Sequence, residues 1–348
     1  MDLSLARRGL EAAVLQGEVP GAVAVVGDAE QIFPVAACGV TRLGGPPVGA
    51  ATRFDLASLS KVVGTLPAVL ALVHAGEVSL DDPVRRFFSS AGWFQTPSLG
   101  DVTVRQLLTH TAGLPAWRPL YAEASTRLSA LGNLLQTLPA QPPGGVVYSD
   151  LGFMLLGALV ERVSKLGLDA FTQTHVFGPL ELTATGYGVP AGVSVAATED
   201  CGWRGRVLQG EVHDENAFVF DGVAGHAGVF GTAPDVARYA QAWLRLQAPF
   251  ASAELLQRAT AEHARDATNK TVGGRRGWGW QLAGEGSSAG HKVGPNAYGH
   301  TGFTGTSLWV DPDQNRFAVL LTNRVHPSRT CGKNIHALRV AFHDAVFA

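Results

Sequence analysis

The sequence contains few cysteines, little net charge and no long hydrophobic run, and each shortage argues against a class of protein. Its three cysteines, Cys38, Cys201 and Cys331, lie far apart and form no CxxC pair. A disulfide framework or a zinc ribbon is therefore not expected, and the scattered thiols fit a reducing compartment. The formal net charge of −2 gives no reason to expect nucleic acid or an anionic membrane as a partner.

The hydrophobic runs are short throughout the chain. Nowhere do about eighteen apolar residues follow one another, so the sequence predicts no membrane span. Segment 1–8 has no uninterrupted apolar stretch behind its charges, unlike a secretory signal, and we expect a cytoplasmic location by default. The length of 348 residues suffices for one large domain, or two interleaved ones, with a sizeable core.

What the sequence does contain is strand patterns at both ends and helix patterns between them. Apolar β-type runs predict strands at 21–26, 31–37, 53–57, 277–282, 306–310 and 316–322. Helical spacing predicts helices at 3–16, 58–76, 83–88, 104–110, 124–138, 150–166, 168–176 and 333–346, with another starting at Thr232. We predict an α+β fold, in which one antiparallel sheet built from both termini is flanked by the terminal helices.

The same pattern predicts how the chain is organised. We expect a single domain over 1–348, with a sheet lobe formed by 1–75 plus 275–348 and a mostly helical lobe, 76–274, inserted between them. A cleft between two such lobes is the default place for a functional site.

The first candidate site is Ser58-Leu59-Ser60-Lys61, at the predicted start of a helix. Residues three apart share a helix face, so Ser58 and Lys61 can touch, whereas Ser60 points away and is interpreted as a bystander. A hydroxyl beside an amine that can lose its proton is a nucleophile pair, and helix-start N–H groups favour negative charge nearby. The motif alone is a weak signal, although Lys61 is the only lysine with a serine three residues before it.

Two further motifs are also weak when each is taken alone. Tyr148-Ser149-Asp150 follows a Pro/Gly loop and precedes an apolar helix, so a helix cap with a packing residue explains it well. The run Gly299–Gly305, GHTGFTG, leads into a predicted strand, where its small residues would let a substrate backbone approach closely. An isolated turn containing a hydrogen-bonded histidine explains this run equally well.

Taken together, the three motifs resemble those of the serine β-lactamase and penicillin-binding-protein superfamily. Its members carry S-x-x-K, then Y-x-N or S-x-N, then K-T-G or H-T-G, in this order. The chain is most similar to the class C-like branch, which includes D-alanyl-D-alanine carboxypeptidases and family VIII carboxylesterases. Supporting stretches lie at 78–84, 104–114 and 225–232, and the resemblance runs from about residue 10 to 345. It implies a β-lactamase/transpeptidase-like fold.

The resemblance also implies a two-step acyl transfer that needs no cofactor and no metal. Ser58 would attack a carbonyl, with Lys61 or Tyr148 as the base, and water would release the acyl-enzyme. The backbone N–H groups of Ser58 and Phe303 would form the oxyanion hole, where each donor commonly contributes roughly 3–4 kcal/mol. The residues implied in substrate binding are Asp150, His300, Thr301 and Gly302.

Asp150 departs from the family pattern, which usually has asparagine there. An unperturbed lysine has a pKa of about 10.4, and a carboxylate about 4 Å away would favour its charged form by up to roughly 4 kcal/mol. If Asp150 faces Lys61, Lys61 stays charged and Tyr148 is the better base. Alternatively, Asp150 turns away or is itself protonated. In either case position 150 lacks the amide donor that can hold a substrate carbonyl.

His300 is a milder departure, since some D-alanyl-D-alanine peptidases of this family also have His-Thr-Gly. It replaces a fixed charge by one expected to titrate near pH 6.5, so recognition of a substrate carboxylate should weaken as pH rises. Together with Asp150, this favours ester or peptide hydrolysis over fast β-lactam turnover, and we predict that any β-lactam hydrolysis is slow.

The leading hypothesis is a serine acyl hydrolase acting on small-molecule esters, D-amino-acid peptides or amides. The alternative from a different class is a non-catalytic, penicillin-recognising binding or sensor protein. His213 and His226 suggest a metal-dependent hydrolase, but their spacing matches no zinc motif. Arg204 and Arg206 could bind a substrate carboxylate, but we interpret them as residues of a solvated loop. Trp278 and Trp280 are interpreted as alternating strand residues in the core or the cleft wall.

Overall fold

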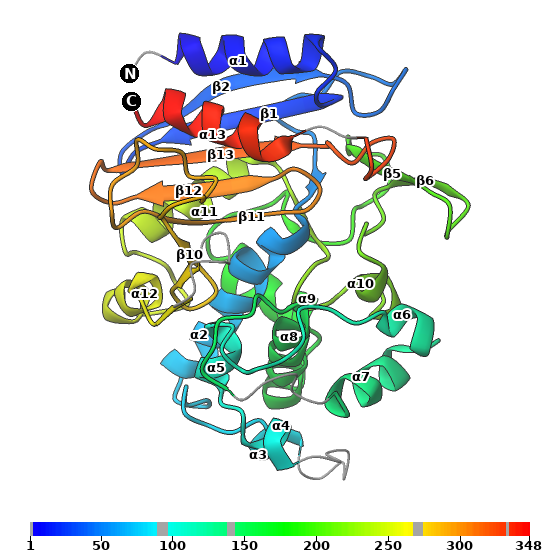
Figure 1. Cartoon of the computed structure of the whole chain (residues 1–348), viewed down its shortest axis with the longest axis vertical. Helices are drawn as coiled ribbons and strands as arrows, with labels where there is room; N and C mark the ends of the chain where they lie inside the picture. The colour runs from blue at the N-terminus through cyan, green and yellow to red at the C-terminus, as the bar shows by residue number, and fades with distance from the viewer. Residues whose placement is uncertain (1–2, 89–96, 138–142, 267–273, 332–333) are drawn as a thin grey trace.

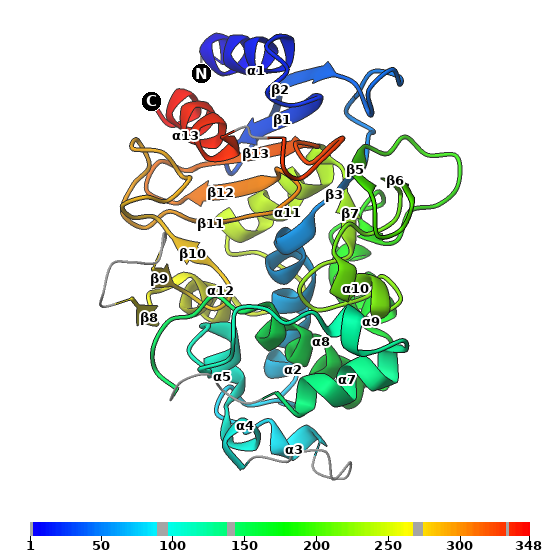
Figure 2. The same ribbon diagram turned by 45° about the vertical axis from the view of Figure 1, so that its right-hand side comes forward.

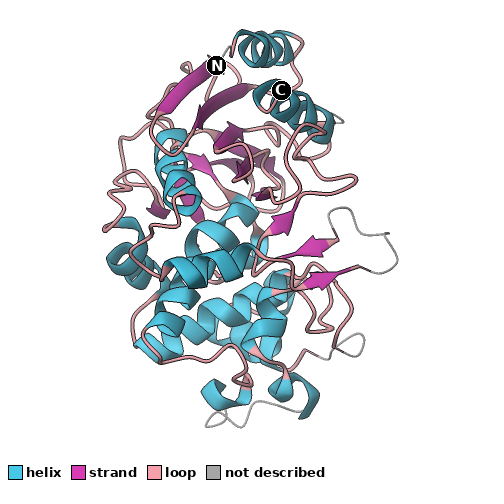
Figure 3. Ribbon diagram, turned by 90° about the vertical axis from the view of Figure 1, so that its left-hand side faces the viewer, coloured by secondary structure: helices cyan, strands magenta, loops and turns pink. Residues whose placement is uncertain are grey.

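The computed structural model describes residues 3–88, 97–137, 143–266, 274–331 and 334–348. Strands gather at one end of the elongated molecule and most helices at the other (Figures 1 and 3). The two chain termini lie beside each other at the strand-rich end (Figure 1). Segments from opposite ends of the sequence therefore build the same part of the fold.

The main sheet has eight antiparallel strands in the order β2-β1-β13-β12-β11-β10-β9-β8. Their bounds are Gly21–Gly27 (β1), Ile32–Gly39 (β2), Ala264–Arg265 (β8), Arg275–Arg276 (β9), Gln281–Leu282 (β10), Tyr298–Thr301 (β11), Ser307–Asp311 (β12) and Arg316–Thr322 (β13). β1 lies between β2 and β13, with Val23 opposite Leu321. The predicted antiparallel sheet built from both termini is confirmed.

Both faces of this sheet are buried, because alternate residues of the central strands pack against different helices. Ala22 and Ala24 belong to the core under α1 (Ser4–Leu15) and α13 (Ile335–Val346). Val23 faces the larger core on the other side, which α11 (Ala233–Leu244) joins by packing against β1, β12 and β13. The terminal helices flank the sheet as predicted.

The helical part surrounds two buried helices, α2 (Leu66–His74) and α8 (Asp150–Ser164). The other helices here are α3 (Arg85–Phe88), α4 (Pro97–Asp101), α5 (Val104–Leu108), α6 (Leu120–Glu123), α7 (Arg127–Leu135), α9 (Leu168–Thr172), the π-helical η4 (Gln173–Phe177), α10 (Glu215–Val219) and α12 (Ala253–Thr260). β8 lies within the segment expected to be helical, yet it joins the main sheet. The lobe boundaries at 75/76 and 274/275 stay a prediction.

Two strand predictions need correction. The strand expected at 53–57 is only Phe54–Asp55 (β3), and it pairs with β7 (Val229–Gly231) rather than with the main sheet. β4 (Gly186–Tyr187) completes this small sheet, and β5 (Ala197–Cys201) and β6 (Arg206–Gln209) form a separate hairpin.

The strand expected at 277–282 is likewise shorter than predicted. Trp278 and Trp280 are fully buried in a turn between β9 and β10, where Gly277 N–H donates to Trp280 O at 3.0 Å. Gly279 has a φ of 71°, a left-handed conformation that glycine adopts without steric cost. The two tryptophans therefore fill the core from a turn, not from alternating strand positions.

One segment, Ala57–His74, is long and apolar enough to cross a membrane by length and composition alone. In the fold, 78% of this window is buried inside the protein, and α2 forms its second half. The segment serves here as the central core helix, next to the first candidate motif.

Candidate active site

Ser58 lies in a tight 3₁₀ turn, η1 (Ala57–Leu59), that follows β3 directly. Buried Asp55 fixes this turn, because its carboxylate accepts the N–H of Ala57 at 2.8 Å and that of His213 at 2.7 Å. Ala57 has a φ of 48°, a conformation that costs energy for any residue other than glycine. The surrounding contacts hold this strained turn and present Ser58 at the start of a helical segment.

Lys61 begins a π-helical turn, η2 (Lys61–Thr65), and its side chain is fully buried. Such turns are rare and recur at functional sites. Its ammonium Nζ donates to Ser58 Oγ at 2.9 Å and to the carbonyl of His226 at 3.3 Å. The predicted contact between Ser58 and Lys61 is therefore present. Ser60 has a structural role, because its Oγ accepts the N–H of Val229 at 3.1 Å.

Asp150 faces Lys61, and its Oδ1 lies 2.7 Å from Lys61 Nζ. Burial alone would lower the pKa of Lys61, but Asp150 and Tyr148 outweigh it and hold this pKa above its ordinary value. Of the arrangements left open by the sequence, the structure has the one in which the ammonium stays charged.

Tyr148 lies in a loop that the preceding segment holds in place. Val147 N–H donates to the carbonyl of His110 at 2.9 Å, and Ser149 N–H donates to His110 Nδ1 at 3.1 Å. The Tyr148 ring lies 4.7 Å from the His110 ring and 4.9 Å from Lys61 Nζ, measured from ring centroids. Segment 104–114, a supporting stretch in the sequence, thus serves as the platform for this motif.

His300 lies on β11, and its ring centroid is 5.7 Å from that of Tyr148. Its Nδ1–H donates to the carbonyl of Thr301 at 2.8 Å. Burial and the nearby charges of Lys61 and Arg276 hold the pKa of His300 well below 6.5. The expectation that His300 titrates near pH 6.5 is therefore wrong, because the ring is buried among cations and stays neutral.

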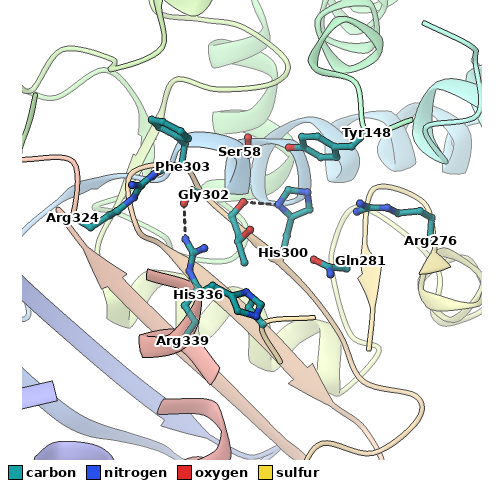
Figure 4. Close-up of a pocket in the computed structure, with 12 residues that line it drawn as sticks. Ser58, Tyr148, Arg276, Gln281, His300, Gly302, Phe303, Arg324, His336 and Arg339 are labelled. Atoms are coloured by element: carbon teal, nitrogen blue, oxygen red, sulfur yellow. Dashed lines mark hydrogen bonds between the residues drawn. The ribbon is translucent and has the colours of Figure 1, made fainter. Parts of the chain in front are cut away.

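The turn after β11 brings Gly302 and Phe303 beside Ser58 (Figure 4). Arg339 donates to the Gly302 carbonyl at 2.6 Å, and Arg324 donates to the Phe303 carbonyl at 2.9 Å. Thr304 and Thr306 tie the turn to β3 and η1 through hydrogen bonds to the Asp55 and Leu56 carbonyls. All three motifs therefore meet at one place.

Ser58 opens onto two adjoining cavities. The first, of about 440 Å³, is lined by Ser58, Tyr148, Arg276, Gln281, Ser288, His300, Thr301, Gly302, Phe303, Arg324, His336 and Arg339. The second, of about 290 Å³, is lined by Ala57, Ser58, Trp117, Tyr148, Asp150, His213, Asp214, Glu215, Ala227, Phe303 and Arg329. We call them the cationic cavity and the Trp117 cavity.

The cationic cavity contains three arginines, Arg276, Arg324 and Arg339, and none of its described lining residues is an aspartate or a glutamate (Figure 4). Within the ranges that the structure describes, none of the three forms an ion pair with a carboxylate. Burial and the charge of Arg324 lower the pKa of Arg339 to about 9. This cavity is suited to an anion.

The sequence did not single out these arginines, because none of them belongs to a motif. Arg276 is 4% exposed and comes from the short strand β9, and its guanidinium lies 5.4 Å from the centroid of the Tyr148 ring. The only available signal was the pair Arg275-Arg276 before the tryptophan turn, which alone does not point to a site.

The residues that suggested a metal have other partners. His213 Nε2 lies 3.1 Å from Glu199, and His226 Nε2 lies 2.8 Å from Asp214. Among the described residues, no group of three or more His, Cys, Asp or Glu side chains is placed to hold a metal ion. Arg204 is not a solvated loop residue, because its side chain is 2% exposed and donates to the carbonyls of residues 212–214.

An antiparallel sheet flanked by terminal helices, with a Ser–Lys pair at the helix that begins beside it, is the β-lactamase/transpeptidase-like fold of a class of serine hydrolases. The chain belongs to the Beta-lactamase family, whose model matches residues 6–342. The recognition from the three motifs is therefore confirmed, and so is the serine hydrolase class.

Individual relatives carry several activities in their names. The chain is 34% identical to N-acetylmuramyl-L-alanine amidase of Bacillus subtilis, over 88% of this chain and 78% of that one. It is 30% identical to a "Putative D-alanyl-D-alanine carboxypeptidase" of Salmonella typhi, over 79% and 70%. The solved structure of EstCE1, a hydrolase with promiscuous acyltransferase activity, superposes with a TM-score of 0.80 at 22% identity, over 99% and 98%, and shares the fold.

Proposed function

We propose that this protein hydrolyses amide bonds through an acyl-enzyme on Ser58, in substrates whose leaving group carries a carboxylate. The observation that carries the proposal is the 2.9 Å contact of Lys61 Nζ with Ser58 Oγ, where the two cavities meet. A hydroxyl, a buried ammonium and a phenol gathered in one cleft are the groups that acyl transfer needs.

In this mechanism Tyr148 reacts as the phenolate and accepts the proton of Ser58 as Oγ attacks the carbonyl carbon. The charged ammonium of Lys61 stabilises this phenolate before the attack by charge attraction. The oxyanion of the tetrahedral intermediate is held by the N–H groups of Ser58 and Phe303. Tyr148 then returns the proton to the departing amine as the C–N bond breaks. In the second step Tyr148 accepts a proton from the water that attacks the acyl-enzyme, and it returns this proton to Ser58 Oγ as the acyl group leaves.

The assignment of Tyr148 as the base follows from the charge of Lys61. An ammonium has no free electron pair, so Lys61 could accept a proton only after losing one of its own. The neighbouring carboxylate of Asp150 opposes that loss. Tyr148 lies beside Lys61, and the positive charge of that ammonium favours the phenolate that the reaction needs.

The cationic cavity supports an acidic leaving group. Three arginines without a carboxylate partner among the described residues favour a bound anion, and the guanidinium of Arg276 lies 5.4 Å from the centroid of the Tyr148 ring. The amine released by an N-acetylmuramyl-L-alanine amidase ends in a carboxylate, which fits this arrangement, and the relative of that name is 34% identical to this chain.

A second candidate substrate is a peptide that ends in D-alanyl-D-alanine. Its terminal carboxylate suits the same cavity, and one relative carries that activity in its name. For β-lactams we propose slow turnover, because Asp150 offers no amide donor for the acyl side of the substrate. The non-catalytic sensor remains the competing hypothesis.

The test compares wild type with Ser58→Ala on muramyl dipeptide, a D-alanyl-D-alanine peptide, p-nitrophenyl acetate and nitrocefin, each with and without EDTA. We expect release of the dipeptide amine by wild type, an acyl adduct on Ser58 by mass spectrometry, and loss of both in the variant. Ser129→Ala, at an exposed serine of α7, should behave as wild type.

Each contrary result points to a different hypothesis. Turnover that persists in Ser58→Ala would exclude the serine mechanism. A stable adduct on Ser58 without turnover would indicate the sensor, and loss of activity with EDTA would indicate a metal.

A further inference from the structure

Four aromatic side chains form a connected row on the surface beside the active site. They are Trp117, Tyr121, Trp203 and Phe218, and their successive ring centroids are 6.3, 5.0 and 5.8 Å apart. Trp117, Trp203 and Phe218 are 46%, 51% and 38% exposed. Exposed aromatic side chains that touch one another in this way mark a binding surface rather than a core. We call them the aromatic row.

The aromatic row is held rigidly, although its members come from separate elements. Trp117 precedes α6, Tyr121 lies on α6, Trp203 lies in the turn between β5 and β6, and Phe218 lies on α10. β5, β6 and α10 lie on the same side of the molecule (Figures 1 and 2). Asn216 joins two of these elements, because it accepts the N–H of Tyr121 at 3.0 Å and donates to the carbonyl of residue 118 at 2.8 Å.

Arg204 fixes the other end of the aromatic row. Its guanidinium lies 5.3 Å from the Trp203 ring and 4.3 Å from the Phe218 ring, while its nitrogens bond the carbonyls of Val212 and His213. The rings are thus pre-organised, which lowers the entropy lost on binding a ligand.

The aromatic row connects two hollows. At one end, Trp117 lines the Trp117 cavity, which also contains Ser58. At the other end, Phe218 lines a separate cavity of about 640 Å³, whose wall also carries the polar side chains of Ser125, Thr126, Glu211 and Asp221. A ligand lying along the row would run from the nucleophile to a pocket that carries hydroxyls and carboxylates beside apolar side chains.

We infer that the aromatic row is a subsite for a saccharide attached to the acyl side of the substrate, an inference that rests on the proposed amide hydrolysis. Sugar rings have apolar C–H faces that stack on aromatic rings and hydroxyl edges that bond carboxylates and hydroxyls. The row offers the first surface, and the pocket beyond Phe218 offers the second. A fatty acyl chain would form no hydrogen bonds with the hydroxyls and carboxylates of that pocket.

The position of the aromatic row also agrees with the charges of the site. The arginines lie in the cationic cavity, which would receive the acidic leaving group, and Trp117 lies in the other cavity next to Ser58. The two halves of a sugar–peptide amide would then occupy opposite sides of the nucleophile.

The binding test uses chitotetraose, which has sugar rings but no amide to the peptide, in isothermal titration calorimetry with the whole protein. We expect saturable binding to wild type, roughly tenfold weaker binding to Trp203→Ala, and binding close to wild type for Trp203→Phe, which keeps a ring. Leu5→Ala removes a similarly exposed apolar side chain on α1, outside the row, and should change nothing.

The kinetic test uses a disaccharide muramyl peptide, p-nitrophenyl acetate and p-nitrophenyl octanoate. Trp203→Ala should raise KM for the muramyl peptide roughly tenfold, with kcat and the rates on both esters unchanged. An absence of chitotetraose binding, an unchanged KM for the muramyl peptide, or a raised KM for the octanoate alone overturns the subsite. Chitotetraose binding without muramyl peptide cleavage supports the subsite and rejects the proposed amide hydrolysis instead.

Discussion

The carboxylate of Asp150 lies 2.7 Å from the ammonium of Lys61, which is completely buried, whereas Asp150 retains 18% exposure. This pair decides the chemistry of the site, because it keeps charged the amine that would otherwise be the obvious base. The ammonium then acts as an electrostatic partner for Ser58 and Tyr148. An asparagine at position 150, as the family usually has, would leave that charge without its nearest anion.

The first prediction concerns stability. Asp150→Asn should lower the free energy of unfolding by about 1–3 kcal/mol, below the 3–5 kcal/mol typical of a broken buried pair because Asp150 is partly exposed. The pKa of Lys61 is raised in the folded state, so this contribution is fully present below the ordinary lysine pKa of 10.5 and is lost as pH rises through the folded value. Urea denaturation at pH 6 and pH 8 should therefore show the same loss.

The matched control is Asp101→Asn, in an ion pair with Arg85 where Asp101 is 63% exposed. Such surface pairs contribute at most about 1 kcal/mol. Equal stability losses in the two variants would contradict the role assigned to Asp150.

The second prediction concerns the base. Tyr148→Phe should lower kcat on p-nitrophenyl acetate by roughly 10²–10⁴-fold, the usual range for a lost general base, with little change in KM. Tyr121→Phe also removes a phenol hydroxyl but lies outside the Ser58 contacts, and it should keep wild-type kcat. A fall of less than tenfold in Tyr148→Phe would return the role of base to Lys61.

Much of the fold followed from sequence pattern, because long amphipathic or buried segments have a strong period. β13 was predicted at its observed bounds, and α1 and α13 within two residues. Short elements were missed or misplaced. β8 and β9 have two residues each, which is too few to show a hydrophobic period. They are strands only because they pair with neighbouring strands. Trp278 and Trp280 are two residues apart, a spacing that suggested a strand, but both are buried in a turn.

The site was predictable only where residue type and spacing carry the chemistry. The contact of Ser58 with Lys61 was predictable because residues three apart lie on the same face of a helix. The arginines of the cationic cavity come from β9, the segment after β13 and α13, and nothing in the local sequence brings them together. The pKa of His300 likewise depends on burial and on Arg276, which no motif reports.

The third prediction concerns the stability of the fold at acidic pH. Burial and the charge of Arg339 lower the pKa of His343 to about 3, while an unfolded histidine titrates near 6.5. The unfolded state then binds more protons, so stability falls as pH drops below about 6.5, by about 2 kcal/mol at pH 5 for this residue. His343→Gln, which can still bond Ser307, should remove that part of the pH dependence in urea denaturation.

Exposed His74 provides the control, since His74→Gln should keep the wild-type slope between pH 6.5 and pH 5. An unchanged slope in His343→Gln would show that the loss arises elsewhere.

The fourth prediction tests the cationic cavity with two adjacent residues of one strand. Arg276→Gln should raise KM for a carboxylate-ending amide substrate roughly 10- to 100-fold, the loss expected for a charge-assisted hydrogen bond, and leave KM for p-nitrophenyl acetate unchanged. Arg275→Gln is the matched control, because Arg275 pairs with Glu262 and does not line the cavity. Since His300 is neutral, the effect should be the same from pH 6 to pH 8. A KM that rises between those pH values in wild type would restore His300 as the titrating carboxylate ligand.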